Sequence, residues 1–145
     1  MRRETLVSAP PEEVWRVVSN PARLPAWWPS VSRVEDASPE AWTKVLMSPG
    51  GKAVRADYTR VEADEPVRLV WRHEVEESPF ERILSASTTE IMLEPSDGGT
   101  LVRISVEHRP RGWARFSPFQ MRAAATRQVS GACDGLAELL GGEAG

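Results

Sequence analysis

Six consecutive stretches of this sequence, between residues 31 and 109, alternate apolar and polar side chains with a period of two. Such alternation is typical of strands that turn one face to a core and the other to water. Turn-forming residues separate the stretches, for example Asp64-Glu65-Pro66 and Ser96-Asp97-Gly98-Gly99. Short connections favour antiparallel hairpins. The pattern therefore predicts a meander of strands over about residues 31–37, 41–48, 52–62, 66–76, 80–94 and 99–109.

The segments on either side of this meander have different patterns. Residues 2–8 read as one more strand, which ends before Pro10-Pro11. A short helix then extends to Ser19-Asn20, and a second helical piece over 21–28 ends in Trp27-Trp28. Residues 113–140 repeat apolar side chains at spacings of three and four, which predicts a long helix that ends at Gly141-Gly142.

These elements predict an α+β domain. A seven-stranded antiparallel curved sheet with one apolar face would grip the long C-terminal helix, and the two short helices between strands 1 and 2 would close one end. The 145 residues suit a single domain spanning 1–145. The cleft between sheet and helix is where we expect function to reside.

Composition excludes several classes of function. Hydrophobic residues make up 41% and charged residues 27% of the chain, which is ordinary for a globular protein. A net charge of −3 gives no reason to expect nucleic acid as a partner. Cys133 is the single cysteine, so no internal disulfide can form, and a cytoplasmic location is the simplest expectation. No apolar run has the length of a signal peptide or a membrane span, so we expect no stable membrane insertion.

Strand parity predicts which side chains face the cleft. Arg68, Arg72 and Glu74 mark the outer face of one strand, so the residues between them should face inward. On the long helix, small residues between large ones should leave room for a ligand. Alternatively, Trp71, Tyr58 or Met92 fills that space. The predicted inward residues are Val67, Leu69, Trp71, His73, Val75, Val54, Ala56, Tyr58, Thr89, Ile91, Leu93, Val102, Ile104, Val106, His108, Phe116, Phe119, Ala123, Thr126, Leu136 and Leu140.

Two strings carry a resemblance to a known superfamily. Residues 8–31, SAPPEEVWRVVSNPARLPAWWPSV, combine a helix opening, an Asn-Pro break and a Trp-Trp-Pro turn. Residues 88–110, TTEIMLEPSDGGTLVRISVEHRP, place Leu-Glu-Pro before a Gly-Gly-Thr turn. Both strings resemble the START-like (SRPBCC, helix-grip) superfamily, in its polyketide cyclase/dehydrase and lipid-transport branch. The resemblance implies a helix-grip fold, but it names no substrate because this fold serves many functions.

Side chains with candidate chemistry are few. His73 and His108, the only histidines, are candidate acid/base groups, and Tyr58 could polarise a carbonyl. Each histidine could equally be a hydrogen-bonded residue at the end of a strand. We expect no metal and no cofactor, since no ligand motif is present. Trp27, Trp28 and Trp42 could form an aromatic mouth. The predicted ligand-binding residues are Trp27, Trp71, Thr89, Ile91, Ile104, Val106, Phe119, Ala123 and Thr126.

Three functional hypotheses follow from the expected cleft and its side chains. The first is binding of a small apolar or lipid/polyketide-like molecule between sheet and helix. The second is cyclase or dehydratase chemistry in the same pocket, with His73 or His108 as acid/base. The third is a protein-interaction module related to chaperone activators, which requires a filled interior. A homodimer is compatible with the sequence, although no interface pattern specifies it.

Overall fold

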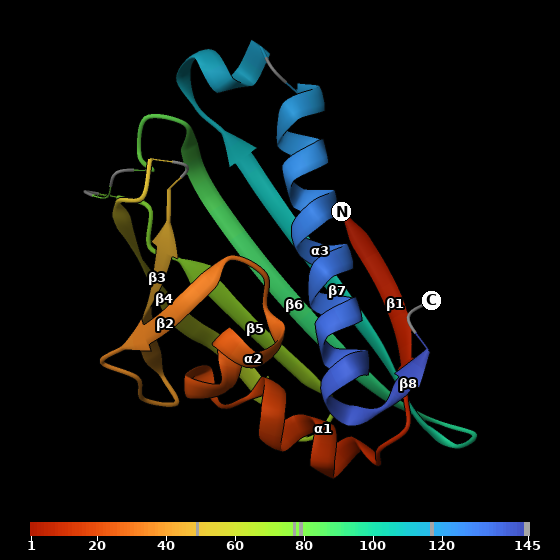
Figure 1. The fold of residues 1–145 in the computed structure, drawn as a ribbon. Coiled ribbons are helices and arrows are strands. Elements are labelled where there is room, and N and C mark those ends of the chain that lie inside the picture. Colours follow the sequence, from red (N-terminus) through yellow and green to blue (C-terminus); the bar gives the residue numbers. More distant parts are fainter. Residues whose placement is uncertain (49, 77, 79, 117, 144–145) are drawn as a thin grey trace.

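The computed structural model describes the whole chain except residues 49, 77, 79, 117 and 144–145. Within that part, antiparallel strands form one sheet in the order β2-β3-β4-β5-β6-β7-β1-β8 (Figure 1). The strands are β1 (Arg2–Val7), β2 (Val31–Glu35), β3 (Ala41–Met47), β4 (Ala53–Asp64), β5 (Arg68–His73), β6 (Leu84–Ser96), β7 (Gly99–Pro110) and β8 (Gly142–Glu143).

The helices lie where the sequence places them. Two short helices separate β1 from β2, and the long helix follows β7, so the predicted α+β fold is confirmed. The two-residue β8, which pairs with β1, was not predicted. The helical elements are α1 (Pro11–Val18), η1 (Pro21–Arg23), α2 (Leu24–Trp27), η2 (Gly112–Phe116) and α3 (Pro118–Leu140).

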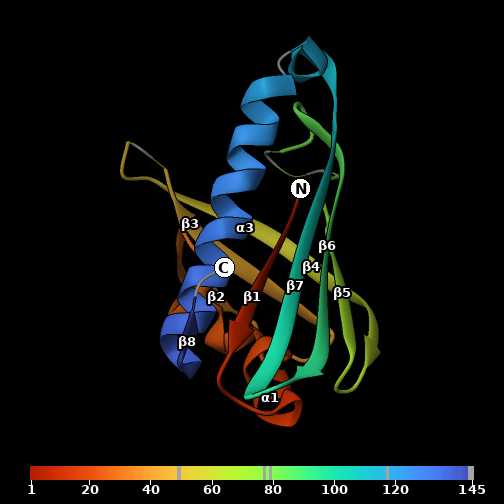
Figure 2. The same cartoon turned by 90° about the vertical axis from the view of Figure 1, so that its right-hand side faces the viewer.

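The sheet curves around α3. The long helix runs across the sheet and packs against β1, β7 and α2, while α1 and α2 lie at its C-terminal end (Figures 1 and 2). On the other side of α3, strands β2 to β4 bend away from β6 and β7, so that the helix lies in the bend (Figure 1). No helix in the described part of the chain is long and apolar enough to span a membrane.

The strand faces follow the predicted parity. Leu69 on β5 pairs with Ile91 on β6, which in turn pairs with Ile104 on β7, and all three side chains are buried. The charged neighbours of these residues face outward, because burying an unpaired charge is costly. Val67 is a correction: it is 44% exposed, since β5 begins only at Arg68 and Val67 lies in the preceding turn.

The first half of α3 is rotated relative to our prediction. Phe119 is 83% exposed, Ala123 is also exposed, and the Thr126 hydroxyl donates to the Arg122 carbonyl. Phe116, on η2, is 80% exposed. The prediction was wrong here because three consecutive alanines erase the helical periodicity. The buried face of α3 is formed by Ala125, Val129, Ala132, Cys133, Leu136 and Ala137.

Candidate functional site

A pocket lies between α3 and the concave face of the sheet. Its cavity volume is about 220 Å³. A cavity of about 150 Å³ is enough to hold benzene, so a somewhat larger small molecule fits. Strands β3 to β7, the connection between β5 and β6, and the first half of α3 supply its walls. The lining residues are Trp28, Lys44, Leu46, Tyr58, His73, Phe80, Ile83, Leu84, Ser87, Thr89, Val106, His108, Met121, Ala124 and Gln128.

Lys44 on β3 projects into this pocket, and sequence reasoning missed it. Its side chain is only 2% exposed. The ammonium nitrogen lies 4.4 Å from the ring centre of Trp28 and 4.3 Å from that of Tyr58. Trp71 lies at 5.6 Å. Such contacts are attractive, because the face of an aromatic ring carries partial negative charge. Burial nevertheless lowers the pKa of Lys44 to about 7.

A signal for Lys44 was present in the sequence. Along β3, Lys44 has the same parity as Trp42 and Leu46, so an inward Trp42 requires an inward Lys44. A lysine on an otherwise apolar strand face is uncommon, because the charge is expensive to bury without a partner. The predicted inward residues include none from this strand, and Lys44 was missed for that reason.

His73 and Tyr58 are stacked beside Lys44. The two rings lie 4.8 Å apart at an interplanar angle of 17°, and the edge of Phe80 meets His73 at the same distance. Burial lowers the pKa of His73 to about 4, and the nearby charges of Lys44 and His108 act in the same direction. His73 is therefore neutral at pH 7. Its Nε2 atom is buried without a hydrogen-bond partner within the described residues.

The pKa values of the two other predicted reactive groups are also shifted away from neutral pH. Burial lowers the pKa of His108, and the N-terminal ammonium contributes in the same direction. The Nδ1 atom of His108 also lacks a hydrogen-bond partner among the residues described. Burial raises the pKa of Tyr58, which keeps its phenol protonated. At pH 7 the pocket thus contains neutral imidazoles and a phenol, and the pKa of Lys44 lies close to that pH.

The structure brings only some of the predicted catalytic and ligand-binding residues together. Tyr58, His73, His108, Thr89 and Val106 line the pocket. Trp71, Ile91 and Ile104 lie in the core and do not line it. The same is true of Trp27, which is 3% exposed and packs edge-on against Trp28. Trp42 is also buried, so the expected aromatic mouth is wrong for these two indoles.

On α3, a different set of residues faces the pocket. Phe119, Ala123 and Thr126 do not line it, and their places are taken by Met121, Ala124 and Gln128. The helix is rotated so that its more apolar C-terminal half packs fully against the sheet. Most of the buried residues of α3 lie farther along the helix, from Ala125 to Ala137, so no local pattern around Met121 indicates this rotation.

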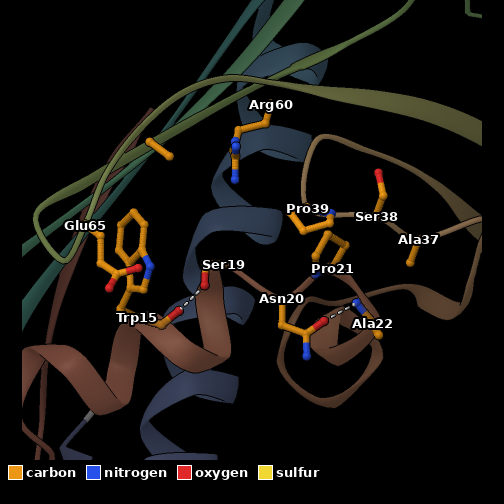
Figure 3. Close-up of a pocket in the computed structure, with 11 residues that line it drawn as sticks. Trp15, Ser19, Asn20, Pro21, Ala22, Ala37, Ser38, Pro39, Arg60 and Glu65 are labelled. Atoms are coloured by element: carbon orange, nitrogen blue, oxygen red, sulfur yellow. Dashed lines mark hydrogen bonds between the residues drawn. The ribbon is translucent and has the colours of Figure 1, made fainter.

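A second depression lies beside the C-terminal end of α1 and the turn between β2 and β3 (Figure 3). It is larger, about 540 Å³, and its walls are formed largely by turns. Two of its polar side chains are engaged locally: the Ser19 hydroxyl donates to the Trp15 carbonyl at 2.6 Å, and the Asn20 side chain accepts from the Ala22 amide at 3.2 Å. The sheet–helix pocket is the better candidate, because it alone of these two combines buried aromatic walls with unpartnered polar atoms.

Metal-ligating side chains are scattered over the fold. Across the residues that the structure describes, no three His, Cys, Asp or Glu side chains gather closely enough to hold a metal ion. Cys133 is buried on α3, and burial raises the pKa of its thiol to about 11. A thiol in this state behaves as a small apolar side chain.

The comparisons with known proteins agree with this architecture. The sequence model of the family described as "Polyketide cyclase / dehydrase and lipid transport" matches residues 1–141. The chain belongs to this family. No curated protein sequence matches the chain. The resemblance recognised in residues 8–31 and 88–110 is thus confirmed at the level of the family.

Solved structures of the polyketide cyclase/dehydrase type share the fold. The di-domain ARO/CYC StfQ of the steffimycin biosynthetic pathway aligns with a TM-score of 0.76 at 12% identity, over 97% of this chain and 49% of its own. The di-domain ARO/CYC BexL of the BE-7585A biosynthetic pathway also aligns with a TM-score of 0.76 at 15% identity. The alignment covers 99% of this chain and 50% of the BexL chain. This family member therefore spans about half the length of either di-domain protein.

A structure of similar size also matches. A protein from Chromobacterium violaceum aligns with a TM-score of 0.71 at 20% identity, over 99% of this chain and 97% of its own. Identities this low establish the helix-grip fold and carry no substrate. The chemistry of this family member must therefore be argued from its own pocket.

Proposed function

We propose that this protein binds a small, mostly apolar molecule in the pocket between the curved sheet and α3. The observation that carries the proposal is the composition of the pocket wall. Aromatic and aliphatic side chains supply most of it, and a few buried polar groups converge on the same space. Apolar walls provide affinity and fixed polar groups orient the ligand, which is how small-molecule sites are generally built.

The catalytic alternative in its predicted form, with His73 as acid/base and Tyr58 polarising a carbonyl, has less support from the site, and Lys44 is the pocket side chain whose pKa of about 7 would suit proton transfer. A proton-transfer group works best when its pKa lies near the working pH. His73, with a pKa of about 4, is a weak base, and the raised pKa of Tyr58 makes it a weak acid. The interaction-module alternative requires a filled interior, whereas a pocket of about 220 Å³ lies under α3. Binding is therefore the function that the geometry favours.

The test uses two neighbouring alanines of α3. Ala124 lines the pocket, whereas Ala123 is exposed and does not. An indole at position 124 would occupy much of the cavity, so we expect Ala124→Trp to weaken the binding of decanol by at least about tenfold. Isothermal titration calorimetry measures the affinity, and circular dichroism checks that each variant is folded.

Ala123→Trp is the matched control, because it adds the same side chain one position away on the outer side of the helix. Its affinity for decanol should stay within about twofold of the unmodified protein. Equal binding by both variants would show that decanol does not occupy the sheet–helix pocket. No binding of decanol to the unmodified protein would count against the proposed function itself.

A further inference from the structure

The side chains that line the pocket around Lys44 are cationic or neutral, and none is acidic. None of the residues that line the pocket is an Asp or a Glu. The titratable groups facing the ammonium from the neighbouring strands are Tyr58 on β4, His73 on β5 and, beyond it, His108 on β7. From α3 come Met121, Ala124 and Gln128, which carry no charge. Every titratable group in the pocket is thus either neutral at pH 7 or cationic.

The two carboxylates that act on the neighbouring His73 are engaged elsewhere. Asp57 and Glu74 act on His73 from the outer side of the sheet. Asp57 accepts a hydrogen bond of 2.6 Å from the Thr43 hydroxyl, and Glu74 pairs with Arg72 at 2.9 Å. Among the described residues, no carboxylate lies within ion-pairing distance of Lys44, although the chain's arginines form several such pairs.

Aromatic rings only partly compensate a buried ammonium. A cation–π contact contributes about 0.5–2 kcal/mol, whereas removing a charge from water costs several kcal/mol. An apolar residue at position 44 would fit the surrounding tryptophans without this cost. The charge is therefore a liability for the fold unless it meets an anion that the described residues do not supply.

We propose that the ligand of this pocket is an amphipathic organic anion whose acidic oxygen pairs with the ammonium group of Lys44. This inference rests on the proposed function. It adds the chemical class of the ligand: an apolar body held against Leu46, Val106 and Met121, with a carboxylate or an acidic enol or phenol placed at Lys44. His73 and Gln128 can offer hydrogen bonds to the same oxygen atoms.

The test compares two probes that share a chain length and differ in charge. Decanoate is ionised at pH 7, and decanol is neutral. Both are titrated calorimetrically into the unmodified protein and the Lys44→Met and Lys52→Met variants. Lys52 is the chain's other lysine and is exposed, so its replacement removes the same charge from the surface.

We expect a selective loss of affinity for decanoate, and only when Lys44 is replaced. Lys44→Met should weaken decanoate binding by at least about tenfold relative to its effect on decanol binding, because only decanoate loses an ion pair. Lys52→Met should bind both probes as the unmodified protein does. If Lys44→Met changes the two affinities equally, the inferred ion pair is wrong while the proposed apolar binding stands. If neither probe binds the unmodified protein, the proposed function fails and the inference fails with it.

A second measurement needs no variant. Near pH 8, His73 and His108 are neutral and Tyr58 is protonated, so Lys44 is the pocket group that titrates. Pairing with an anion raises its pKa, so decanoate binding should take up as much as about one proton while decanol binding takes up none. Calorimetry in two buffers of different ionisation enthalpy measures the uptake. Equal uptake with both probes would overturn the proposal.

Discussion

At the residue scale, the role proposed for Lys44 in ligand binding comes at the expense of the stability of the fold. Its pKa of about 7 in the folded protein, against 10.5 for the free side chain, means that the unfolded chain binds more protons between these values. Folding is therefore opposed by the charge of Lys44 at low pH, and stability rises as the pH increases from about 7 to about 10.5. Residues that serve a site at the expense of stability are common in binding proteins.

This linkage predicts how Lys44→Met behaves without any ligand. Below pH 7 the variant avoids burying a charge, so its free energy of unfolding should exceed that of the unmodified protein by on the order of 2 kcal/mol. Near pH 10 the lysine is largely neutral in the folded state, and the difference should shrink. Chemical denaturation at about pH 6 and about pH 9.5 measures both values. Lys52→Met should change neither, and a Lys44→Met profile parallel to that of the unmodified protein would contradict the assignment.

At the element scale, the seating of α3 on the short helices depends on glycine. Gly135 lies where α3 crosses α2, and a Cβ atom there would lie 2.3 Å from the carbonyl oxygen of Trp27. That distance is far inside van der Waals contact, and the obstacle is backbone that cannot swing aside. The close approach lies at the backbone of Trp27, whose indole is buried in the core.

We expect Gly135→Ala to destabilise the fold by on the order of 2 kcal/mol, because the cost of separating α3 from α2 exceeds the gain in helix propensity. Gly131→Ala is the comparison, since it has the same intrinsic gain and its Cβ would lie 3.0 Å from Pro29 Cγ, a side-chain atom. Urea denaturation should show a clearly larger loss at position 135. Equal effects at the two positions would show that the helices separate easily.

At the scale of the whole molecule, the pocket exists only when distant segments meet. Lys44 and Tyr58 come from the bent half of the sheet, Val106 and His108 from β7, and Ala124 from α3. The unfolded chain has no such arrangement, so a ligand of the pocket binds the folded state alone. Binding of this kind stabilises the protein in proportion to the logarithm of the ligand concentration.

The expected consequence is a thermal shift. Decanoate at about one hundred times its dissociation constant should add about 2.7 kcal/mol of stability and raise the midpoint of unfolding by about 5–10 °C, as measured by scanning calorimetry. Ala124→Trp, with its pocket blocked, should show a much smaller shift at the same concentration. A similar shift in that variant would indicate binding at another surface.

Much of this architecture follows from local patterns in the sequence. The alternation on β5, β6 and β7 predicted the inward positions of Trp71, Ile91 and Ile104, because parity depends only on the pleat of each strand. The turns were predictable as well: Gly98, between β6 and β7, adopts a φ of 81°, which glycine tolerates best. His73, His108 and Tyr58 were recognised as residues of one inner face, and they do line one pocket.

What the sequence could not determine is clearest in the run Ala123-Ala124-Ala125. These side chains are chemically identical, yet Ala123 is exposed, Ala124 lines the pocket and Ala125 is buried. Their fates depend on the rotation of α3, which is set by contacts with the sheet and with α2. The sequence by itself determined the elements and the faces of the strands, because those follow from local chemistry. Only the tertiary structure decided which residues surround Lys44, because that depends on how the sheet bends around the helix.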